Sequence, residues 1–262
     1  MDRKIRIGAV SYLNTKPLLY GLQHEVIVKQ IEIILDYPAR IAAMLEEGRI
    51  DVGLVPVAII PSLKDPHIIS DYCIGCDGPV SSVAIFSEMP LEQVSEILLD
   101  YQSRTSVMLS RILMHYYWKL NPIFRDARGE DYRKDIRADV AGLVIGDRAL
   151  EQKKISPFIY DLGQAWKDFT GLPFVFAAWV SNKKLDEDFI AQFNHANASG
   201  IASIGKVISM EKEPPTDLAE YYSRNISYSL NAEKRKGLEL FLSLMQKINT
   251  KDGLSLPLNT GA

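Results

Sequence analysis

The N-terminal stretch changes abruptly from apolar to polar residues, and this change constrains the fold more than any other feature. Residues 5–10 are mainly apolar and predict a buried strand. Mostly polar residues follow from Ser11 to Lys16, and Pro17 then suits the first turn of a helix. The stretch therefore predicts a strand, a polar junction that includes Ser11 and Asn14, and a helix.

The next elements predict a parallel sheet. Pro38 begins a helical pattern that ends at Gly48, and residues 51–55 form another apolar strand. This strand–helix–strand order is typical of a parallel sheet that is covered on both faces. Ligands bind past the carboxyl ends of such strands, and a helix start offers free backbone N–H groups to an anion. We therefore expect a small-anion site, with Ser11 among its binding residues, at the first junction.

A second junction of the same kind lies in the middle of the chain. Residues 97–99 predict a strand, a polar loop follows, and the pattern becomes helical from Thr105. Ser103 is a good N-cap candidate, and the start of this helix also suits an anion. We therefore expect Ser103, Thr105 and Ser106 to bind the ligand from a second, facing lobe.

The order of predicted elements divides the chain into two α/β lobes with a ligand cleft between them. Residues 1–85 together with 178–262 form the first lobe, whose C-terminal helices cover it, and residues 86–177 form the second. Residues 249–262 contain turn residues and no apolar period, so we expect them to be mobile.

Composition and charge narrow the class of partner. The formal net charge of −3 over 262 residues includes no basic excess, so nothing indicates nucleic-acid binding. No apolar run is long enough to span a bilayer, and the N-terminus lacks the apolar segment of a signal peptide. We expect a cytoplasmic protein that binds a small molecule and neither nucleic acid nor membrane. The oligomeric state stays open.

The only two cysteines, Cys73 and Cys76, form a C-x-x-C pair that invites a zinc or redox interpretation. Zinc requires four ligands, and the four histidines of the chain are scattered. A thioredoxin-like pair should begin a helix, whereas residues 77–79, Asp-Gly-Pro, force a turn. We interpret both cysteines as structural thiols and expect no metal.

Several short motifs occur in order along the chain. They are SYLNTKPL (11–18), GRIDVGLVP (48–56), GCDGPVSS (75–82), SRTSV (103–107), IGD (145–147), DLGQAWK (161–167) and TGLPFVF (170–176). Together they resemble the chorismate dehydratase family of the futalosine route to menaquinone. The resemblance covers about residues 5–181, whereas the C-terminal helices are similar only in general character.

The resemblance implies a type II periplasmic-binding-protein-like fold that works as a cytoplasmic enzyme. It implies a lyase that dehydrates chorismate to 3-[(1-carboxyvinyl)oxy]benzoate without a metal or organic cofactor. It also implies that Asn14 and Ser82 are catalytic, because they match the family's motif positions. Ser81 stands at a position where the family varies.

The motifs offer no obvious general base, because Asn14 and Ser82 are neutral hydrogen-bonding groups. Two motif acids could serve, but a turn role is typical of Asp77 before Gly-Pro, and helix capping is typical of Asp147. We therefore favour substrate-assisted elimination, in which the enolpyruvyl carboxylate of chorismate takes the C3 proton. Asn14 and Ser82 would hold the hydroxyl and that carboxylate in the reactive pose.

The remaining motif residues suit substrate binding. The helix start at Thr105 and Ser106 would hold the second carboxylate, and Asp147 of the IGD motif is also expected to bind the substrate. Arg104 could bind a carboxylate bidentately or equally face solvent.

Two other functions stay open at this point. The first is a non-catalytic protein of the same fold that binds a small anion or another solute, since a fold does not determine function. The second is the later, naphthoate-forming sister enzyme of the pathway, whose N-terminal motif differs from Ser-Tyr-Leu-Asn.

Overall fold

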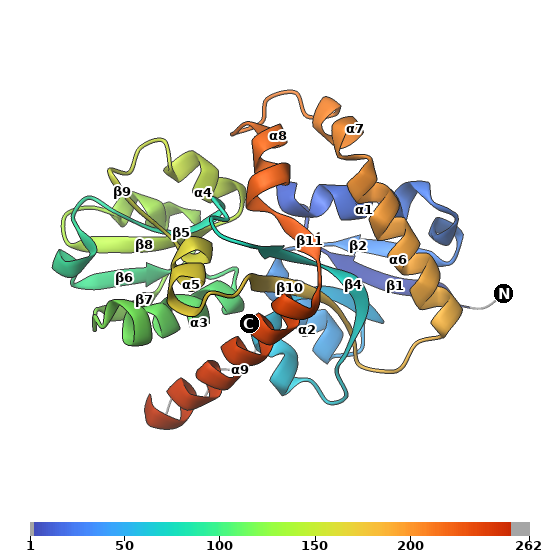
Figure 1. The fold of residues 1–262 in the computed structure, drawn as a ribbon, viewed down its shortest axis with the longest axis horizontal. Helices are drawn as coiled ribbons and strands as arrows, with labels where there is room; N and C mark the ends of the chain where they lie inside the picture. The colour runs from blue at the N-terminus through green and yellow to red at the C-terminus, as the bar shows by residue number, and fades with distance from the viewer. Residues whose placement is uncertain (1–2, 253–262) are drawn as a thin grey trace.

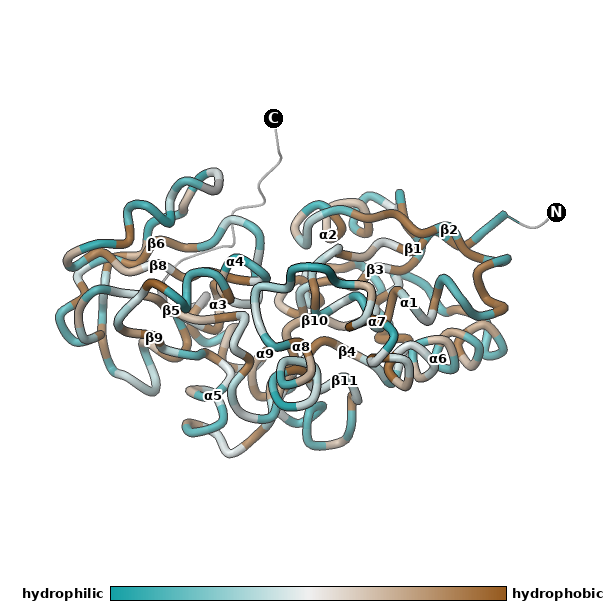
Figure 2. The backbone as a smooth tube through the Cα atoms, turned by 90° about the horizontal axis from the view of Figure 1, so that it is seen from above, coloured by the Kyte–Doolittle hydropathy of each residue, from teal (hydrophilic) through white to brown (hydrophobic). Residues whose placement is uncertain are grey.

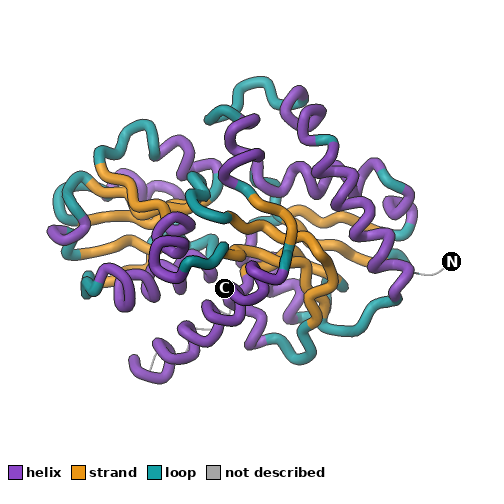
Figure 3. The backbone as a smooth tube through the Cα atoms, in the orientation of Figure 1, coloured by secondary structure: helices purple, strands orange, loops and turns teal. Residues whose placement is uncertain are grey.

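The computed structural model describes residues 3–252, which form two α/β lobes that lie side by side (Figure 1). Each lobe contains one β-sheet with helices packed around it (Figure 3). The two-lobed α/β fold expected from the sequence is confirmed.

The sheet of the first lobe has the strand order β11–β4–β10–β3–β1–β2. Its strands are β1 (Ile5–Ala9), β2 (Ile31–Leu35), β3 (Val52–Pro56), β4 (His67–Cys76), β10 (Phe174–Ser181) and β11 (Ser227–Ser229). β1 is parallel to β2 and β3, as the strand–helix–strand pattern predicts, whereas β10 is antiparallel to β3 and β4. β3 is buried at every position, which explains its unbroken apolar sequence.

The sheet of the second lobe has the order β7–β6–β8–β5–β9. Its strands are β5 (Val83–Ser87), β6 (Glu96–Leu99), β7 (Ile123–Asp126), β8 (Val140–Ile145) and β9 (Phe158–Asp161). β6 is parallel to β7 and β8, and β5 is antiparallel to β8 and β9. Hydrophobic residues gather along the strands inside each lobe, while the outer loops are mainly hydrophilic (Figure 2).

Both connections between the lobes lie slightly earlier in the chain than the expected boundaries at residues 85 and 177. β5 already pairs within the second sheet from Val83, and β10 already pairs within the first sheet from Phe174. The reason is the register of pairing, because each strand joins its sheet as soon as its buried residues begin.

The helices surround the two sheets. They are α1 (Lys16–His24), α2 (Pro38–Glu46), α3 (Arg104–Ile112), α4 (Asp147–Gln152), α5 (Leu162–Thr170), α6 (Glu187–Ala202), α7 (Ile204–Ser209), α8 (Leu218–Glu220) and α9 (Ala232–Asp252). Shorter 3-10 or π turns cover Leu13–Thr15, Val26–Lys29, Val57–Ser62, Leu91–Gln93, Leu113–Trp118, Glu130–Asp135 and Tyr221–Asn225. No helix among the described residues is long and apolar enough to cross a membrane.

Helices α1 and α6 approach each other closely, and this contact fixes the helix that follows the first junction. A Cβ on Gly21 would lie 1.8 Å from the Ala196 carbonyl oxygen, and one on Gly200 would lie 2.0 Å from the Pro17 carbonyl oxygen. Only glycine fits at either position, because each side faces backbone that cannot move aside.

The last helix differs from its prediction in two ways. Phe241 of α9 packs against Trp166 of α5 and Phe174 of β10, with ring centroids 6.3 and 5.1 Å apart, so α9 covers both lobes rather than the first alone. α9 also continues to Asp252, so residues 249–252 are helical where the sequence predicted a mobile tail. No helix breaker interrupts them before Gly253, and residues 253–262 lie outside the described residues.

Two strand predictions also change. The many β-branched residues between Val26 and Leu35 predict one strand. Val26–Lys29 instead form a 3-10 turn, and β2 is only as long as its partner β1, from Ile5↔Ile31 to Ala9↔Leu35. The sequence leaves residues 68–74 open as irregular or a weak strand, and they lie in the ten-residue β4 because β10 and β11 pair on both sides of it.

Candidate active site

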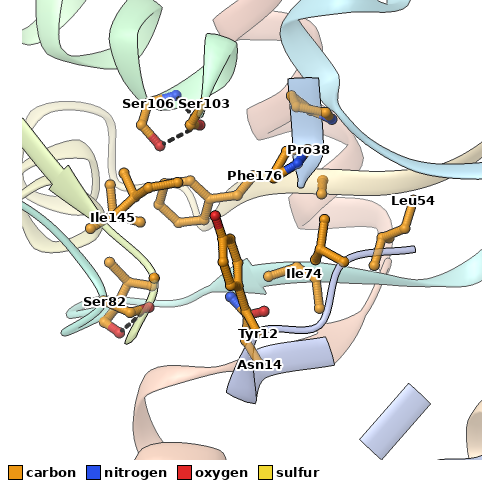
Figure 4. A pocket seen from close by; sticks show the side chains of 16 residues that line it. Tyr12, Asn14, Pro38, Leu54, Ile74, Ser82, Ser103, Ser106, Ile145 and Phe176 are labelled. Carbon is orange, nitrogen blue, oxygen red and sulfur yellow. Dashed lines mark hydrogen bonds between the residues drawn. The ribbon is translucent and has the colours of Figure 1, made fainter. Parts of the chain in front are cut away.

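A cavity lies between the two lobes, at the ends of the strands where both junctions were predicted. The space inside it, including the part that is open to solvent, is about 560 Å³. Its lining comes from both lobes: Val10, Tyr12, Asn14, Pro38, Leu54, Pro56, Ile74, Val80, Ser82, Val83, Ser103, Ser106, Ile145, Gly146, Phe176 and Ala177. Figure 4 shows Ser103 and Ser106 on the opposite side of this cavity from Asn14, with the Tyr12 ring between them.

Asn14 belongs to the 3-10 turn Leu13–Thr15 that joins β1 to α1. The buried Thr15 hydroxyl donates a hydrogen bond of 3.1 Å to Asn14 Oδ1. This bond occupies the carbonyl side of the amide and leaves Nδ2 to donate. The neighbouring Tyr12 donates its hydroxyl hydrogen across the cleft to Gln102 Oε1.

Ser82 ends a loop that the Asp161 carboxylate holds in shape. Asp161 accepts backbone N–H bonds from Val80 at 3.1 Å, Ser81 at 2.7 Å and Gln164 at 3.0 Å. Ser81 adopts a left-handed φ of 61°, which turns the chain into β5. Burial raises the pKa of Asp161, although the backbone N–H bonds counteract part of this effect.

Ser103 and Ser106 mark the start of α3, as predicted. Ser103 is the N-cap, and its Oγ accepts the Ser106 N–H at 3.2 Å. The Ser103 hydroxyl also donates to Ser106 Oγ at 2.9 Å. The first N–H groups of an α-helix have no partner within the helix, so this end of the cavity favours an anionic oxygen.

Hydroxyl and amide groups supply the polarity of the cavity. None of the described residues that line it carries a charged side chain or an imidazole. The site can therefore bind anionic oxygens by neutral hydrogen bonds, but its lining offers no carboxylate or histidine that could act as a general base.

The structure brings four of the eight residues expected at the site to the cavity: Asn14, Ser82, Ser103 and Ser106. The other four lie apart from its lining. Ser11 is exposed on the loop after β1, and Arg104 points to Glu46 of α2 with 3.5 Å between their charged groups. The Thr105 hydroxyl is buried and accepts the Ala58 N–H at 3.2 Å.

Asp147 is the fourth residue that lies outside the cavity lining, and the prediction that it caps a helix is wrong. Gly146, with φ +65°, takes the N-cap position of α4, and Asp147 is the first helical residue. The Asp147 carboxylate reaches the other lobe and accepts the Leu13 N–H at 3.2 Å. Burial raises the pKa of Asp147, although the Leu13 N–H bond opposes this shift.

The other candidates for acid, thiol or metal chemistry also lie away from the cavity. Asp77 is exposed and forms an ion pair of 2.6 Å with Lys167. Cys73 and Cys76 are buried in β4 as free thiols, and burial raises the pKa of Cys76. Within residues 3–252, no group of three or more His, Cys, Asp or Glu side chains could hold a metal ion.

Sequence reasoning missed two tyrosines at this site. Tyr12 lies in the first motif and lines the cavity, so its motif position was the available signal. Tyr221 donates its hydroxyl hydrogen to Ser82 Oγ at 2.9 Å from a segment 139 residues away. No local sequence pattern predicts a contact between residues so far apart in the chain.

Solved structures share this two-lobed fold. A protein of Archaeoglobus fulgidus superposes with a TM-score of 0.69 at 12% identity, over 96% of this chain and 98% of its own. The alkanesulfonate-binding protein SsuA of Xanthomonas axonopodis pv. citri, bound to MOPS, has a TM-score of 0.64 at 13% identity, over 97% and 95% of the two chains. The chain thus has a periplasmic-binding-protein-like fold of two lobes.

Sequence relatives narrow this class. A family model described as menaquinone biosynthesis matches residues 5–247, and the chain belongs to this family. A relative named chorismate dehydratase, from Thermus thermophilus, is 25% identical over 259 residues, which cover 90% of this chain and 93% of the relative.

Proposed function

We propose that this chain is a chorismate dehydratase, a cytoplasmic hydro-lyase of the futalosine route that converts chorismate to 3-[(1-carboxyvinyl)oxy]benzoate and water. One observation carries the proposal: Asn14 and Ser82 line the same cavity as Ser103 and Ser106 at the start of α3. Membership of the menaquinone biosynthesis family and the name of the Thermus thermophilus relative support it.

The polar groups of the cavity suit a substrate with two carboxylates. The start of α3, with Ser103 and Ser106, would bind the ring carboxylate through hydroxyl and backbone N–H donors. Asn14 and Ser82 would face the C4 hydroxyl and the enolpyruvyl carboxylate from the opposite side. The apolar lining, including Phe176 and Ile145, would pack against the ring.

The elimination breaks the C3–H and C4–O bonds and forms a C3=C4 double bond that makes the ring aromatic. The enolpyruvyl carboxylate takes the C3 proton, and the C4 hydroxyl leaves and becomes water with that proton. The reaction is redox-neutral and aromatisation drives it, so the protein mainly orients the substrate, an effect worth up to about 7–11 kcal/mol in favourable cases. Donors that stabilise the departing oxygen could add about 100-fold to 1,000-fold in rate.

Incubation of the purified protein with chorismate tests the proposal. We expect an aromatic product that is lighter by one water, followed by ultraviolet absorbance and mass spectrometry. Tight binding without loss of water would instead favour a solute-binding protein, the role that the name of SsuA describes. Chorismate that is neither bound nor changed would favour the later, naphthoate-forming enzyme.

Two substitutions separate substrate-assisted elimination from a protein base. Asp147→Asn and Asp77→Asn each remove the basic carboxylate of a motif acid and keep its shape. We expect both variants to keep turnover, because neither side chain lines the cavity. Loss of turnover in a folded variant that still binds chorismate would favour a protein base.

A further inference from the structure

Three tyrosines from one C-terminal segment hydrogen-bond the residues of the first junction and Ser82. Tyr222 donates its hydroxyl hydrogen to the Leu13 carbonyl at 2.8 Å, and Tyr228 donates to the Asn14 carbonyl at 2.8 Å. Tyr221 donates to Ser82 Oγ at 2.9 Å, and the Asn14 side chain lowers the pKa of Tyr221 as a nearby hydrogen-bonding group, against the rise caused by burial. We call these three residues the tyrosine clamp.

The clamp is buried and comes from the segment that follows α8 in the chain. The exposed fractions of Tyr221, Tyr222 and Tyr228 are 1%, 3% and 5%. They belong to the π turn Tyr221–Asn225, which follows α8, and to β11, the edge strand of the first sheet beside β4 (Figure 1). The two backbone bonds fix where Asn14 lies, whereas Tyr221 alone contacts the side chains of both Asn14 and Ser82.

The donors and acceptors around Tyr221 define one direction of hydrogen bonding. Asn14 Oδ1 accepts the Thr15 hydroxyl, and a group that lowers the pKa of Tyr221 by hydrogen bonding must be a donor, so Nδ2 is the atom of Asn14 that faces the Tyr221 oxygen. A phenol has a single hydrogen, and Tyr221 gives it to Ser82 Oγ. The network therefore runs from Thr15 through Asn14 and Tyr221 to Ser82.

Ser82 ends this network, and its own hydroxyl hydrogen has only a distant acceptor. The protein acceptor within reach of the Ser82 hydroxyl is the Val80 carbonyl at 3.4 Å, which is long for a hydroxyl donor. An anionic oxygen in the cavity is a better acceptor for that hydrogen. Tyr221 thus turns the Ser82 hydroxyl into a donor that faces the ligand.

We infer that Tyr221 is a positioning residue that holds Asn14 and Ser82 together as a pair of donors to the C4 hydroxyl and the enolpyruvyl carboxylate of the substrate. This inference rests on the proposed function. Tyr221 does not line the cavity, so it acts through Ser82 and Asn14 and not by contact with the substrate. Because it transfers no proton of its own, the balance of the elimination is unchanged.

Tyr221→Phe tests the inference, because it removes the hydroxyl and keeps the ring. We expect kcat for chorismate dehydration to fall about 10-fold or more, with KM changed less, since one oriented donor is lost from the transition state. Tyr160→Phe is the matched control: its hydroxyl accepts the Leu91 N–H at 2.8 Å in the outer strand of the second lobe. We expect this control to keep kcat.

A double-mutant cycle separates a positioning role from a structural one. In the Ser82→Ala background Tyr221→Phe should reduce kcat little further, because its main route of action is already gone. Rates are taken per folded molecule, from the fraction with native near-ultraviolet circular dichroism, so that lost stability does not count as lost kcat. If Tyr221→Phe has the same kcat as Tyr160→Phe, this inference is wrong and the proposed function stands. The same holds if Tyr221→Phe lowers kcat as much in the Ser82→Ala background as in the wild type. If the wild type leaves chorismate unchanged, the proposed function is wrong and the inference with it.

Discussion

The two strand–helix junctions that meet at the cavity are held in place by different means. The Ser103 junction is stabilised locally, because Ser103 caps the helix that begins at the next residue. The turn that contains Asn14 has no side-chain cap, and tyrosines 209 and 214 residues away hold its backbone. One half of this ligand site is therefore held by neighbouring residues, whereas the other half depends on residues near the C-terminal end of the chain.

The largest effect is expected at Asn14, the junction held from a distance. Asn14→Asp keeps the shape of the side chain, removes the Nδ2 donor and places a negative charge beside an anionic substrate. We expect kcat/KM for chorismate to fall about 100-fold to 1,000-fold, measured by product absorbance. Asn121→Asp, an exposed change of the same type, should leave the rate unchanged. Equal rates for the two variants would remove Asn14 from the site.

The second prediction concerns Asp161, which holds the Ser82 loop. Asp161→Ala removes the N-cap of α5 and leaves the N–H groups of Val80 and Ser81 without their acceptor. We expect the free energy of unfolding to fall by about 2–4 kcal/mol, because the helix loses its cap and two backbone N–H groups lose their acceptor at the same time.

Asp186→Ala is the matched control, because Asp186 caps α6 in the same manner but is exposed and supports no further loop. Urea denaturation should show a loss of about 1 kcal/mol for this variant. A similar loss in both variants would mean that Asp161 is only a helix cap.

A smaller effect on catalysis is expected at the Ser103 junction, which is stabilised locally. Ser106→Ala removes one hydroxyl from the cavity, but the Ser106 N–H and the Ser103 cap remain. We expect KM to rise roughly 5-fold with kcat nearly constant, the equivalent of about 1 kcal/mol for one neutral hydrogen bond. Ser209→Ala, on the exposed end of α7, should change neither constant. A loss in kcat as large as that of Asn14→Asp would contradict the difference between the junctions.

The smallest effect is a pH dependence of stability at Asp147, where the two lobes touch. Its pKa in the folded protein is raised by burial, so its stabilising contribution is fully present below the unfolded pKa and is lost as the pH rises through the folded one. Asp147→Asn cannot titrate and can still accept the Leu13 N–H. The Tm of Asp147→Asn should therefore increase relative to that of the wild type as the pH rises from about 3 to about 7.

Asp131 provides a control of opposite sign. The exposed Lys134 lowers the pKa of Asp131 through a hydrogen bond and its charge. Asp131→Asn should consequently lose stability relative to the wild type over the same rise in pH, by a small amount because the pair is exposed to solvent. The same sign for both substitutions would show that burial does not control Asp147.

Local features of this molecule could be predicted from the sequence, and distant ones could not. The Ser103 cap follows from neighbouring residues, and the parallel pairing of β1 with β2 and β3 follows from the order of consecutive strands and helices. The length of β4 could not be predicted, because its partners β10 and β11 lie far along the chain.

The same limit applied to the site. Thr105 and Arg104 were expected at the cavity because they lie in the first turn of α3, but the sequence does not reveal which way a helix faces. In the fold Thr105 meets the Ala58 N–H and Arg104 meets Glu46, both contacts with the first lobe. Tyr221 was missed for the opposite reason, since its contact with Ser82 exists only after the C-terminal segment has folded back.

A crystal structure of the Ser82→Ala variant with chorismate bound would test most directly whether the two junctions share one ligand. The account predicts one carboxylate at the start of α3, within hydrogen-bond distance of Ser103 or Ser106, and the C4 hydroxyl beside Asn14. Chorismate bound outside the cavity, or held by one lobe alone with Asn14 free of contact, would contradict it.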